Sequence, residues 1–404
     1  DVIEAQPLGS LRRRVSTIGD IDFGVTAKDP GKVIDYFLSY PYKERTIEKG
    51  PVSAAMLVSG GKQIDLITLP KNQWGSLLQH FTGSKNHNIH LRELALKKGM
   101  SLSERGIKIK EKGKEILKEF DTEEKFYKAL GMDWIAPEMR EDNGEIELAL
   151  KHDLPKLVEL SDIKADFHIH SSYPLEPSHD MGKNSMDEMI IKAKSLGYSY
   201  IGFSEHNPSQ SKHTSKQIYE FLSRRKEFIE KLRSKHKGFG IVSLMETDIL
   251  PNGSLALDDK ALELLDGTIV SVHSVFSMDK KEMTKRVLQG LAHPKAKILA
   301  HPTGRLLNTR AGYELDFAQI FEFCKKESIA VEINAWPSRL DLPDSLVLQA
   351  VKLGVKMVID TDAHASEQID MMQYGVSVAR RGWAKKSDIL NYLSYNEFEQ
   401  WLKS

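Results

Sequence analysis

The sequence predicts a multi-domain α/β protein, with an N-terminal lobe of strands and helices followed by a barrel of seven βα units. Two observations support this prediction. From residue 165 onward, short β-rich runs alternate with amphipathic helical patterns, as in parallel βα units. The chain of 404 residues, 40% hydrophobic and 28% charged, is long enough for several domains with buried cores.

Composition divides the chain into four segments. The predicted boundaries are 1–70, 71–120, 121–164 and 165–404. The first segment alternates with period two at 18–23 and 62–67, which predicts strands, and Ser59-Gly60-Gly61 predicts a turn before the second strand. The second segment is predicted to be mainly helical, and the third to be an acidic connector.

Charge is unevenly spread although the net charge is zero. Residues 71–120 hold eleven Lys/Arg and five Asp/Glu, a balance of +6, whereas residues 121–160 hold five Lys/Arg and eleven Asp/Glu, a balance of −6. Such a pattern suits a polyanion-binding lobe followed by a solvated connector. Salt-bridged surface helices are the alternative explanation, and composition alone favours them.

Membrane and export signals are not visible in the sequence. No apolar run approaches a membrane span, and the N-terminus has neither a basic region nor an apolar one. The single cysteine, Cys324, has no intrachain partner and is expected to be a small buried residue, which predicts a cytoplasmic protein. The lack of an initial Met is consistent with a fragment or a processed product.

The barrel prediction depends on seven apolar runs. These lie at about 165–170, 199–205, 240–246, 267–273, 297–301, 329–334 and 355–361. Helical patterns fill gaps between them, for example around 185–196, 214–236, 279–291 and 343–353. Parallel strands of a barrel end at one face, so side chains that follow the runs are expected to meet there.

Histidine and acidic residues recur at the ends of these runs. His168 and His170 are two positions apart on one strand and therefore share a face. Asp362 and His364 repeat that spacing where the last run ends. A lone histidine is usually a hydrogen-bonded structural residue. Six segments with such groups instead predict a multi-metal centre, because imidazole and carboxylate bind Zn, Mn and Fe.

A second set of acidic residues lies near the N-terminus. Asp20 and Asp22 share one strand face, and Asp65 on another predicted strand can join them. Three converging carboxylates repel one another unless cations lie among them, and Mg²⁺ prefers oxygen ligands that it shares with substrate phosphates. Upstream, residues 9–14 (Gly-Ser-Leu-Arg-Arg-Arg) offer a glycine, a hydroxyl and guanidinium groups to a triphosphate.

The C-terminal segment resembles the polymerase-and-histidinol-phosphatase (PHP) domains. The matching motifs are D-F-H-I-H-S at 166–171, S-E-H-N at 204–207, E-T-D-I-L at 246–250, V-H-S at 272–274, H-P-T-G-R at 301–305 and D-A-H at 362–364. The resemblance implies a distorted seven-stranded barrel that holds three metal ions, Mn²⁺ or Zn²⁺ among the candidates, and hydrolyses phosphoesters.

The resemblance also implies a ligand set. Its members are His168, His170, Asp180, His206, Glu246, His273, His301, Asp362 and His364. The loop that carries Asp180 is longer than usual, which leaves His179 as the alternative ligand. Glu205 stands where the family commonly has Asp. Arg305 is either a phosphate clamp or a surface arginine.

The N-terminal segments resemble the palm and thumb of family X DNA polymerases. The motifs are the Gly-Ser and arginines at 9–14, G-D-I-D at 19–22, Q-I-D-L at 63–66, H-F-T-G-S at 80–84 and H-N-x-x-L-R-E-L at 87–94. The connector at 127–140 is similar to the linker of bacterial and archaeal members that carry a PHP domain. The resemblance covers essentially the whole chain, and implies that the family's N-terminal helix-hairpin-helix regions are missing here.

By this resemblance Asp20, Asp22 and Asp65 are the catalytic carboxylates and hold Mg²⁺. The implied nucleotide contacts are Gly9, Ser10, Arg13, Gly19, Phe81, Thr82, Gly83 and Asn88, and Arg92 is the implied DNA contact. Taken alone, Phe81 is a core aromatic and Asn88 a surface amide. Arg14, Ile18 and His80 depart from the family's usual residues, and the last bears on ribose discrimination.

The predicted function is DNA repair, with template-directed nucleotidyl transfer in one lobe and 3′–5′ exonuclease or 3′-end phosphoesterase activity in the other. The expected partners are gapped or recessed DNA 3′ ends and deoxynucleoside triphosphates. A small-molecule phosphatase of histidinol-phosphatase type with an inactive N-terminal lobe is the alternative, and a DNA-binding scaffold with vestigial sites is a third hypothesis.

Overall fold

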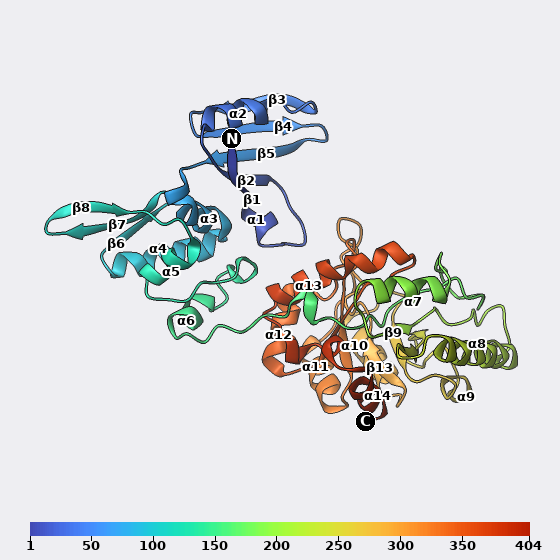
Figure 1. The fold of residues 1–404 in the computed structure, drawn as a ribbon. Helices are drawn as coiled ribbons and strands as arrows, with labels where there is room; N and C mark the ends of the chain where they lie inside the picture. Colours follow the sequence, from blue (N-terminus) through green and yellow to red (C-terminus); the bar gives the residue numbers. More distant parts are fainter. The chain divides into compact units, whose positions relative to one another are not determined.

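The computed structural model describes residues 1–404, and the chain divides into two units, Asp1–Pro155 and Lys156–Ser404 (Figure 1). A five-stranded sheet begins the first unit. Its strands are β1 (Val2–Pro7), β2 (Ile21–Ala27), β3 (Lys43–Lys49), β4 (Ser53–Val58) and β5 (Lys62–Thr68). Their order is β1-β2-β5-β4-β3, and only β2 and β5 run parallel. The predicted hairpin is present, because Gly60 and Gly61 adopt the positive φ angles that its turn requires.

Helices complete this unit. They are α1 (Gly9–Arg12), α2 (Pro30–Leu38), α3 (Trp74–Thr82), α4 (Lys85–Lys97), α5 (Glu123–Ala129) and α6 (Glu145–Leu150). Asp29 caps the N-terminus of helix α2, because its carboxylate accepts a hydrogen bond from the backbone N–H of Lys32. The helix buries Val33 and Ile34 against the sheet. Gly75 allows α3 to approach the segment before α5, since a Cβ there would lie 2.1 Å from the Thr122 carbonyl carbon.

Residues 100–118 differ from the mainly helical structure expected of 71–120. They form a three-stranded antiparallel sheet of β6 (Met100–Ser103), β7 (Gly106–Glu111) and β8 (Lys114–Lys118). Gly99 precedes β6 and Gly113 lies in the turn between β7 and β8, and both have positive φ angles. Ile107 and Ile109 alternate with lysines, a period of two that a helix cannot satisfy.

The second unit consists of parallel strands with helices between them. The strands are β9 (Tyr200–Phe203), β10 (Gly240–Ser243), β11 (Glu246–Asp248), β12 (Thr268–Ser271), β13 (Ala296–Leu299), β14 (Ala330–Asn334) and β15 (Met357–Asp360). The helices are α7 (Met186–Ser195), α8 (Ser215–Lys235), α9 (Asp259–Leu262), α10 (Lys280–Leu291), α11 (Phe317–Lys326), α12 (Asp344–Leu353), α13 (Met372–Arg381) and α14 (Tyr395–Lys403). Strands β9 and β10 pair with each other, and β11 to β15 form one sheet in chain order.

The first predicted run, 165–170, is not a regular strand. Side chains take up its backbone N–H groups: that of Phe167 donates to Asp360, and that of Ile169 donates to Ser204. The run is still paired on both sides, because Gly202 donates to the Asp166 carbonyl and Ile169 forms a parallel bridge with Ala363. It therefore links β9 to the end of β15.

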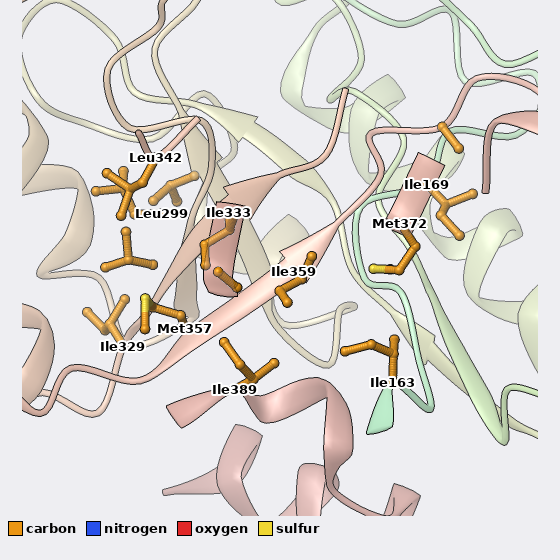
Figure 2. Close-up of a cluster of buried hydrophobic side chains, with 14 of the residues drawn as sticks. Ile163, Ile169, Leu299, Ile329, Ile333, Leu342, Met357, Ile359, Met372 and Ile389 are labelled. Carbon is orange, nitrogen blue, oxygen red and sulfur yellow. The ribbon is translucent and has the colours of Figure 1, made fainter. Parts of the chain in front are cut away.

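Alternation along the strands separates two cores. Ile333, Met357 and Ile359 pack toward the helices together with Leu299 and Ile389 (Figure 2). The opposite faces carry smaller or polar residues such as Ala330, Glu332 and Val358, and a second cluster fills the space there. In that cluster the rings of Phe167 and Phe398 stack at 4.1 Å, so α14 closes one end of the strand assembly.

A buried ion-pair network connects distant segments of the first unit. The Glu123 carboxylate accepts hydrogen bonds from Arg12 at 2.7 Å and from Arg140 at 2.6 Å, and its side chain is 4% exposed. Burial alone would raise the pKa of Glu123, but the two guanidinium groups lower it to about 2.

We predict that Glu123 makes the stability of this unit acid-sensitive. Because its folded-state pKa lies below the ordinary value of 4.5, the ionised pair stabilises the fold fully above pH 4.5, and this contribution is lost as the pH falls toward 2. Glu123→Gln should destabilise the unit by about 3–5 kcal/mol at pH 7, since it leaves buried guanidinium groups uncompensated. Hydrogen exchange of residues 121–141 in the full chain measures this, with exposed Glu124→Gln as the control; equal protection in both variants would contradict it.

Candidate active sites of the two units

The three N-terminal carboxylates lie at one end of the β2–β5 pair. Asp22 and Asp65 are direct partners in the parallel register, and Asp20 precedes β2 by one residue. Burial raises the pKa of Asp22, and repulsion by Asp65 and Asp20 raises it further. The Gln63 amide donates to both oxygens of Asp65 at 3.0 Å. The structure thus brings together the carboxylates that spacing alone placed on two strands.

A tight turn carries the predicted phosphate-binding residues onto this cluster. Gly9 has a φ of +53°, and a Cβ there would lie 2.4 Å from the Asp22 carboxylate, so only glycine allows this approach. Ser10 follows it in the short helix α1 and is half-buried. Gly19 is exposed just before the carboxylates, with open space where a side chain would lie.

Hydrogen bonds join Arg13 to the region predicted to bind the sugar. Its guanidinium donates to the Thr82 carbonyl at 2.8 Å and to Glu141 at 2.8 Å. The hydroxyl of the buried Thr82 accepts from Arg12 at 2.6 Å. The Asn88 amide donates to the carbonyls of His80 at 2.9 Å and Gly83 at 3.3 Å.

The other two predicted contact residues, Phe81 and Arg92, are not part of these hydrogen bonds. Phe81 packs partly buried against the apolar cluster around Trp74 and Leu77. Arg92 is exposed on α4. With burial, the charge of Arg92 lowers the pKa of His80. The roles of these residues stay predictions.

The histidines of the second unit converge on one carboxylate, that of Glu246, which is 1% exposed. Five imidazole rings approach its oxygens within 3.5 Å. The distances are 3.1 Å for His168, 3.5 Å for His170, 3.0 Å for His206, 3.2 Å for His273 and 2.9 Å for His301. His168 and His170 come from the irregular run 165–170, and the other three rings follow the ends of β9, β12 and β13.

Asp362 forms a second focus beside it. Its carboxylate lies 3.2 Å from His170 and 3.5 Å from His168. Asp362 and His301 both have positive φ angles, of 55° and 27°, which are strained for residues with a side chain and recur at functional sites.

The long loop places His179 and Asp180 on the same cavity. Asp180 lies 3.4 Å from both His206 and His364, although its side chain is 75% exposed. His179 lies 3.3 Å from Asp248, which in turn accepts from His273 at 2.7 Å. Both residues line the cavity, so the choice between them as a ligand stays open.

Several buried polar atoms in this cluster have no hydrogen-bond partner within the protein. They are His168 Nε2, both ring nitrogens of His170, His206 Nδ1, Glu246 Oε2, His301 Nδ1 and His364 Nε2. Leaving a buried polar atom unpaired costs about 1–3 kcal/mol. Groups of three such side chains, for example His168–His170–Asp362 and His206–Glu246–His273, have ligand atoms within 4.8 Å of one another. The donor set therefore fits divalent cations.

The shifted pKa values in the cluster also indicate a cation site. Burial lowers the pKa values of imidazoles, yet Glu246 raises those of His206 and His273 to about 10 and about 9. His170 is the contrary case, since burial and repulsion by neighbouring imidazoles lower its pKa to about 3. Despite burial, positive neighbours hold the pKa values of Glu246 and Asp362 well below the ordinary range. The pocket thus has ionised carboxylates that favour positive charge.

The cluster opens into a cavity of about 310 Å³. Arg305 is not among its lining residues, because its guanidinium is half-buried and donates to the backbone carbonyls of Arg339 and Leu340. Arg339 does line the cavity, with its Nε 3.4 Å from Asp362. The sequence prediction did not include Arg339.

The residues that hydrogen-bond to the proposed ligands were also not predicted from the sequence. The buried Glu332 carboxylate accepts from His168 Nδ1 at 2.6 Å, from the His301 backbone N–H at 2.6 Å and from Asn334 at 3.2 Å. The same Asn334 amide donates to Asp362 at 3.2 Å. Their period-two spacing on an otherwise apolar run was the available signal.

Glu205 also has a supporting role. Its carboxylate accepts from Arg225 and from the Ser171 hydroxyl, and both Glu205 and Arg225 are buried. The bond between Ser171 and Glu205 joins the segments that carry His170 and His206, and Arg225 connects Glu205 to α8.

Comparison with known proteins adds to this geometry. The model of the DNA polymerase beta thumb matches residues 77–141. A carboxylate triad on a mixed sheet next to such a thumb defines a polymerase-type enzyme, and the histidine cluster adds a site suited to divalent metals. The chain is 35% identical over 404 residues to the DNA polymerase/3′-5′ exonuclease PolX of Bacillus subtilis (strain 168). The aligned region covers all of this chain and 69% of that protein. The chain belongs to this PolX family.

Other matches are weaker. A probable phosphatase of Thermoanaerobacter sp. (strain X514) is 26% identical over 170 residues, 40% of this chain and 67% of that protein. A crystal structure of Leishmania infantum polymerase beta in a ternary complex has a TM-score of 0.30 and 23% identity, and covers 34% of this chain and 67% of that one. Family membership confirms the predicted enzyme class, a DNA polymerase combined with a 3′–5′ exonuclease, and does not favour the small-molecule phosphatase. No helix in the structure has the length and apolar character needed to span a membrane.

We predict that Glu332 fixes the metal-binding geometry. The two carboxylate oxygens of Glu332 accept one hydrogen bond each from His168 and from the His301 backbone. In Glu332→Gln one of these oxygens is replaced by an NH₂ group, which is itself a donor, so one of the two hydrogen bonds is lost. Affinity for Mn²⁺ should fall about 10–100-fold, the scale found for residues that orient metal ligands. Calorimetric titration measures this against Glu327→Gln, an exposed control on α11's C-terminal side; matching affinities would refute the assignment.

Proposed function

We propose that the chain extends DNA 3′ ends at the carboxylate cluster of the first unit and hydrolyses 3′-terminal phosphoesters at the histidine cluster of the second. Family membership supports the pair of activities. One observation carries the assignment to two sites: each unit holds its own converging set of ligand side chains, Asp22 with Asp65 in one and the rings around Glu246 in the other.

We assign the palm to 1–70, the thumb to 71–120, an acidic linker to 121–164 and a PHP-type barrel to 165–404. The mixed sheet supports the palm, and the thumb match at 77–141 overlaps the second segment. The parallel pairing of β11 to β15, and the links from 165–170 to β9 and β15, support a distorted seven-stranded barrel.

In the polymerase site Asp20, Asp22 and Asp65 would hold Mg²⁺, which neutralises phosphate charge and favours the ionised 3′-hydroxyl. Asp65 helps to accept the proton of that hydroxyl. The 3′-oxygen then bonds to the α-phosphorus of the incoming nucleotide, the bond from that phosphorus to the bridging oxygen breaks, and pyrophosphate leaves.

Residues around the turn at Gly9 would position the nucleotide. Ser10, Arg13 and Gly19 contact its triphosphate, Arg13 through a fork suited to phosphate oxygens. The proposed sugar and base contacts are Phe81, Thr82, Gly83 and Asn88, with Arg92 on the template strand. The hydrogen bond from Arg13 to the Thr82 carbonyl supports the placement of these two groups in one pocket.

In the second site three ions of Mn²⁺ or Zn²⁺ would be held by His168, His170, Asp180, His206, Glu246, His273, His301, Asp362 and His364. Bound ions lower the pKa of water and neutralise charge on phosphate oxygens. Water oxygen bonds to the 3′-terminal phosphorus, the bond to the preceding 3′-oxygen breaks, and that oxygen takes a proton. The products are a 5′-mononucleotide and a DNA 3′-hydroxyl.

The proposed substrates are gapped or recessed DNA 3′ ends and deoxynucleoside triphosphates, in the cytoplasm. Lysines on β7 and β8, such as Lys108, Lys110 and Lys114, give the thumb region its positive charge. Phosphate contacts of this kind make DNA binding fall steeply with salt.

We predict that Asp20→Ala combined with Asp22→Ala lowers nucleotide addition at least about a hundredfold, because the ions that stabilise charge in the transition state are lost. Shortening of the primer should persist. One gel with 5′-labelled primer–template and Mn²⁺, with and without dNTPs, resolves longer and shorter products. Asp35→Ala, an exposed carboxylate on α2, is the control. Loss of both reactions would mean that they share one site.

We predict the reverse for His168→Ala combined with His170→Ala. Removing two imidazoles from the cluster should abolish 3′-end hydrolysis and lower the metal bound per chain, while nucleotide addition continues. Mass spectrometry of metals in the purified protein gives the second readout, and exposed His152→Ala is the control. Unchanged metal content would rule out the ligand set.

A further inference from the structure

The cavity above the histidine cluster has a second wall that supplies none of the proposed metal ligands. Leu306, Trp336, Ser338 and Arg339 line it. They come from the loops that follow β13 and β14. An apolar side chain, an indole and a guanidinium are a poor set for a cation but a suitable set for an organic phosphate. Arg339 is also the one Lys or Arg among the residues that line the cavity.

This wall is held firmly at its base. The backbones of Asn334 and Asp341 hydrogen-bond to each other across the loop. The buried Asp341 carboxylate accepts from the Thr303 hydroxyl at 2.9 Å and from its backbone N–H. The Leu307 backbone N–H donates to the Ser338 carbonyl at 2.6 Å, which joins the two loops. Side chains on such a loop face the cavity in a fixed arrangement.

Arg305 supports the same loop. Its Nε donates to the Arg339 carbonyl at 2.9 Å, and its Nη2 donates to the neighbouring Leu340 carbonyl. A guanidinium used in this way is a brace for the loop, and the guanidinium that faces the cavity is that of Arg339.

Trp336 presents a large aromatic surface beside the cluster. It is partly buried, and its ring lies 6.5 Å from that of His364 at an angle of 74°. Indole faces stack on nucleobases with little dependence on sequence, at about 1–3 kcal/mol per base. A phosphate in the cavity would meet Arg339, whose Nε lies 3.4 Å from Asp362 at the edge of the cluster.

The volume restricts what can enter. At about 310 Å³ the cavity lies at the lower end of the range for small-ligand pockets, which suits one nucleotide rather than a base pair. The wall formed by Leu306, Trp336, Ser338 and Arg339 offers stacking and charge, whereas the other polar side chains that line the cavity belong to the histidine cluster and its loop.

We propose that Trp336 and Arg339 form a subsite for the last nucleotide of an unpaired 3′ end, with the indole stacked on its base and the guanidinium on the phosphate whose ester bond breaks. The inference rests on the proposed exonuclease function of this unit. The substrate class is single-stranded or frayed DNA, without preference for one base.

The test compares two 5′-labelled single-stranded oligonucleotides that differ only at the 3′-terminal residue, one ending in deoxyadenosine and the other in an abasic tetrahydrofuran analogue. Release of the last residue is measured with Mn²⁺ for the full-length wild type, Trp336→Ala and Trp336→Phe. Tyr374→Ala is the control, because Tyr374 is an exposed aromatic on α13 of the same unit. Bound metal is measured for each variant, which separates loss of the subsite from loss of the cluster.

The wild type should prefer the base-bearing end by roughly tenfold in kcat/KM, as stacking of one base implies. Trp336→Ala should reduce that ratio to about one with its metal content retained, whereas Trp336→Phe and Tyr374→Ala should keep most of it. A wild type that removes both ends equally, or a Trp336→Ala variant that keeps the preference, overturns the subsite and leaves the exonuclease intact. A wild type that removes neither end overturns the exonuclease proposal itself.

Discussion

The burial of Glu246 among five imidazole rings is the constraint on which the second unit depends. A carboxylate that is 1% exposed must be compensated, yet only its Oε1 is hydrogen-bonded, to His301 Nε2 at 2.9 Å, while its Oε2 has no hydrogen-bond partner within the protein. Cations resolve this conflict, because they accept both carboxylate and imidazole as ligands. The fold then has to supply these side chains from several strand ends at once, which a parallel assembly does through its loops.

The first unit meets a milder form of the same constraint. Asp22 and Asp65 are neighbours in register, and their repulsion is reduced by partial exposure and by the Gln63 amide. Oxygen ligands alone suit Mg²⁺, whereas the imidazole-rich cluster suits Mn²⁺ or Zn²⁺. The two sites would therefore serve opposite reactions at a DNA 3′ end with different metals in one chain.

Sequence periodicity predicted much of this arrangement. Strand spacing placed His168 with His170 and Asp20 with Asp22. Six of the seven apolar runs hold parallel strands, but the first run is irregular, and the run at 240–246 is divided between β10 and the start of β11. The supporting residues were harder to predict, because Glu332 lies in a short run of apolar residues, and only the fold shows that it reaches both His168 and His301. The sequence indicated Arg305 and not Arg339, because loop conformation decides which guanidinium faces the cavity.

The bonds of Glu123 bear on how the chain can be dissected. Arg12 lies on α1, whereas Glu123 and Arg140 lie within the stretch 77–141 that matches the thumb model, and Arg13 reaches Glu141 at the end of that stretch. The segment that composition marks as a spacer is thus an integral wall of the polymerase unit. A fragment truncated at residue 120 would keep the three carboxylates but lose Glu123 and Glu141, the partners of Arg12 and Arg13, so the smallest intact form of the first unit extends at least through Glu141.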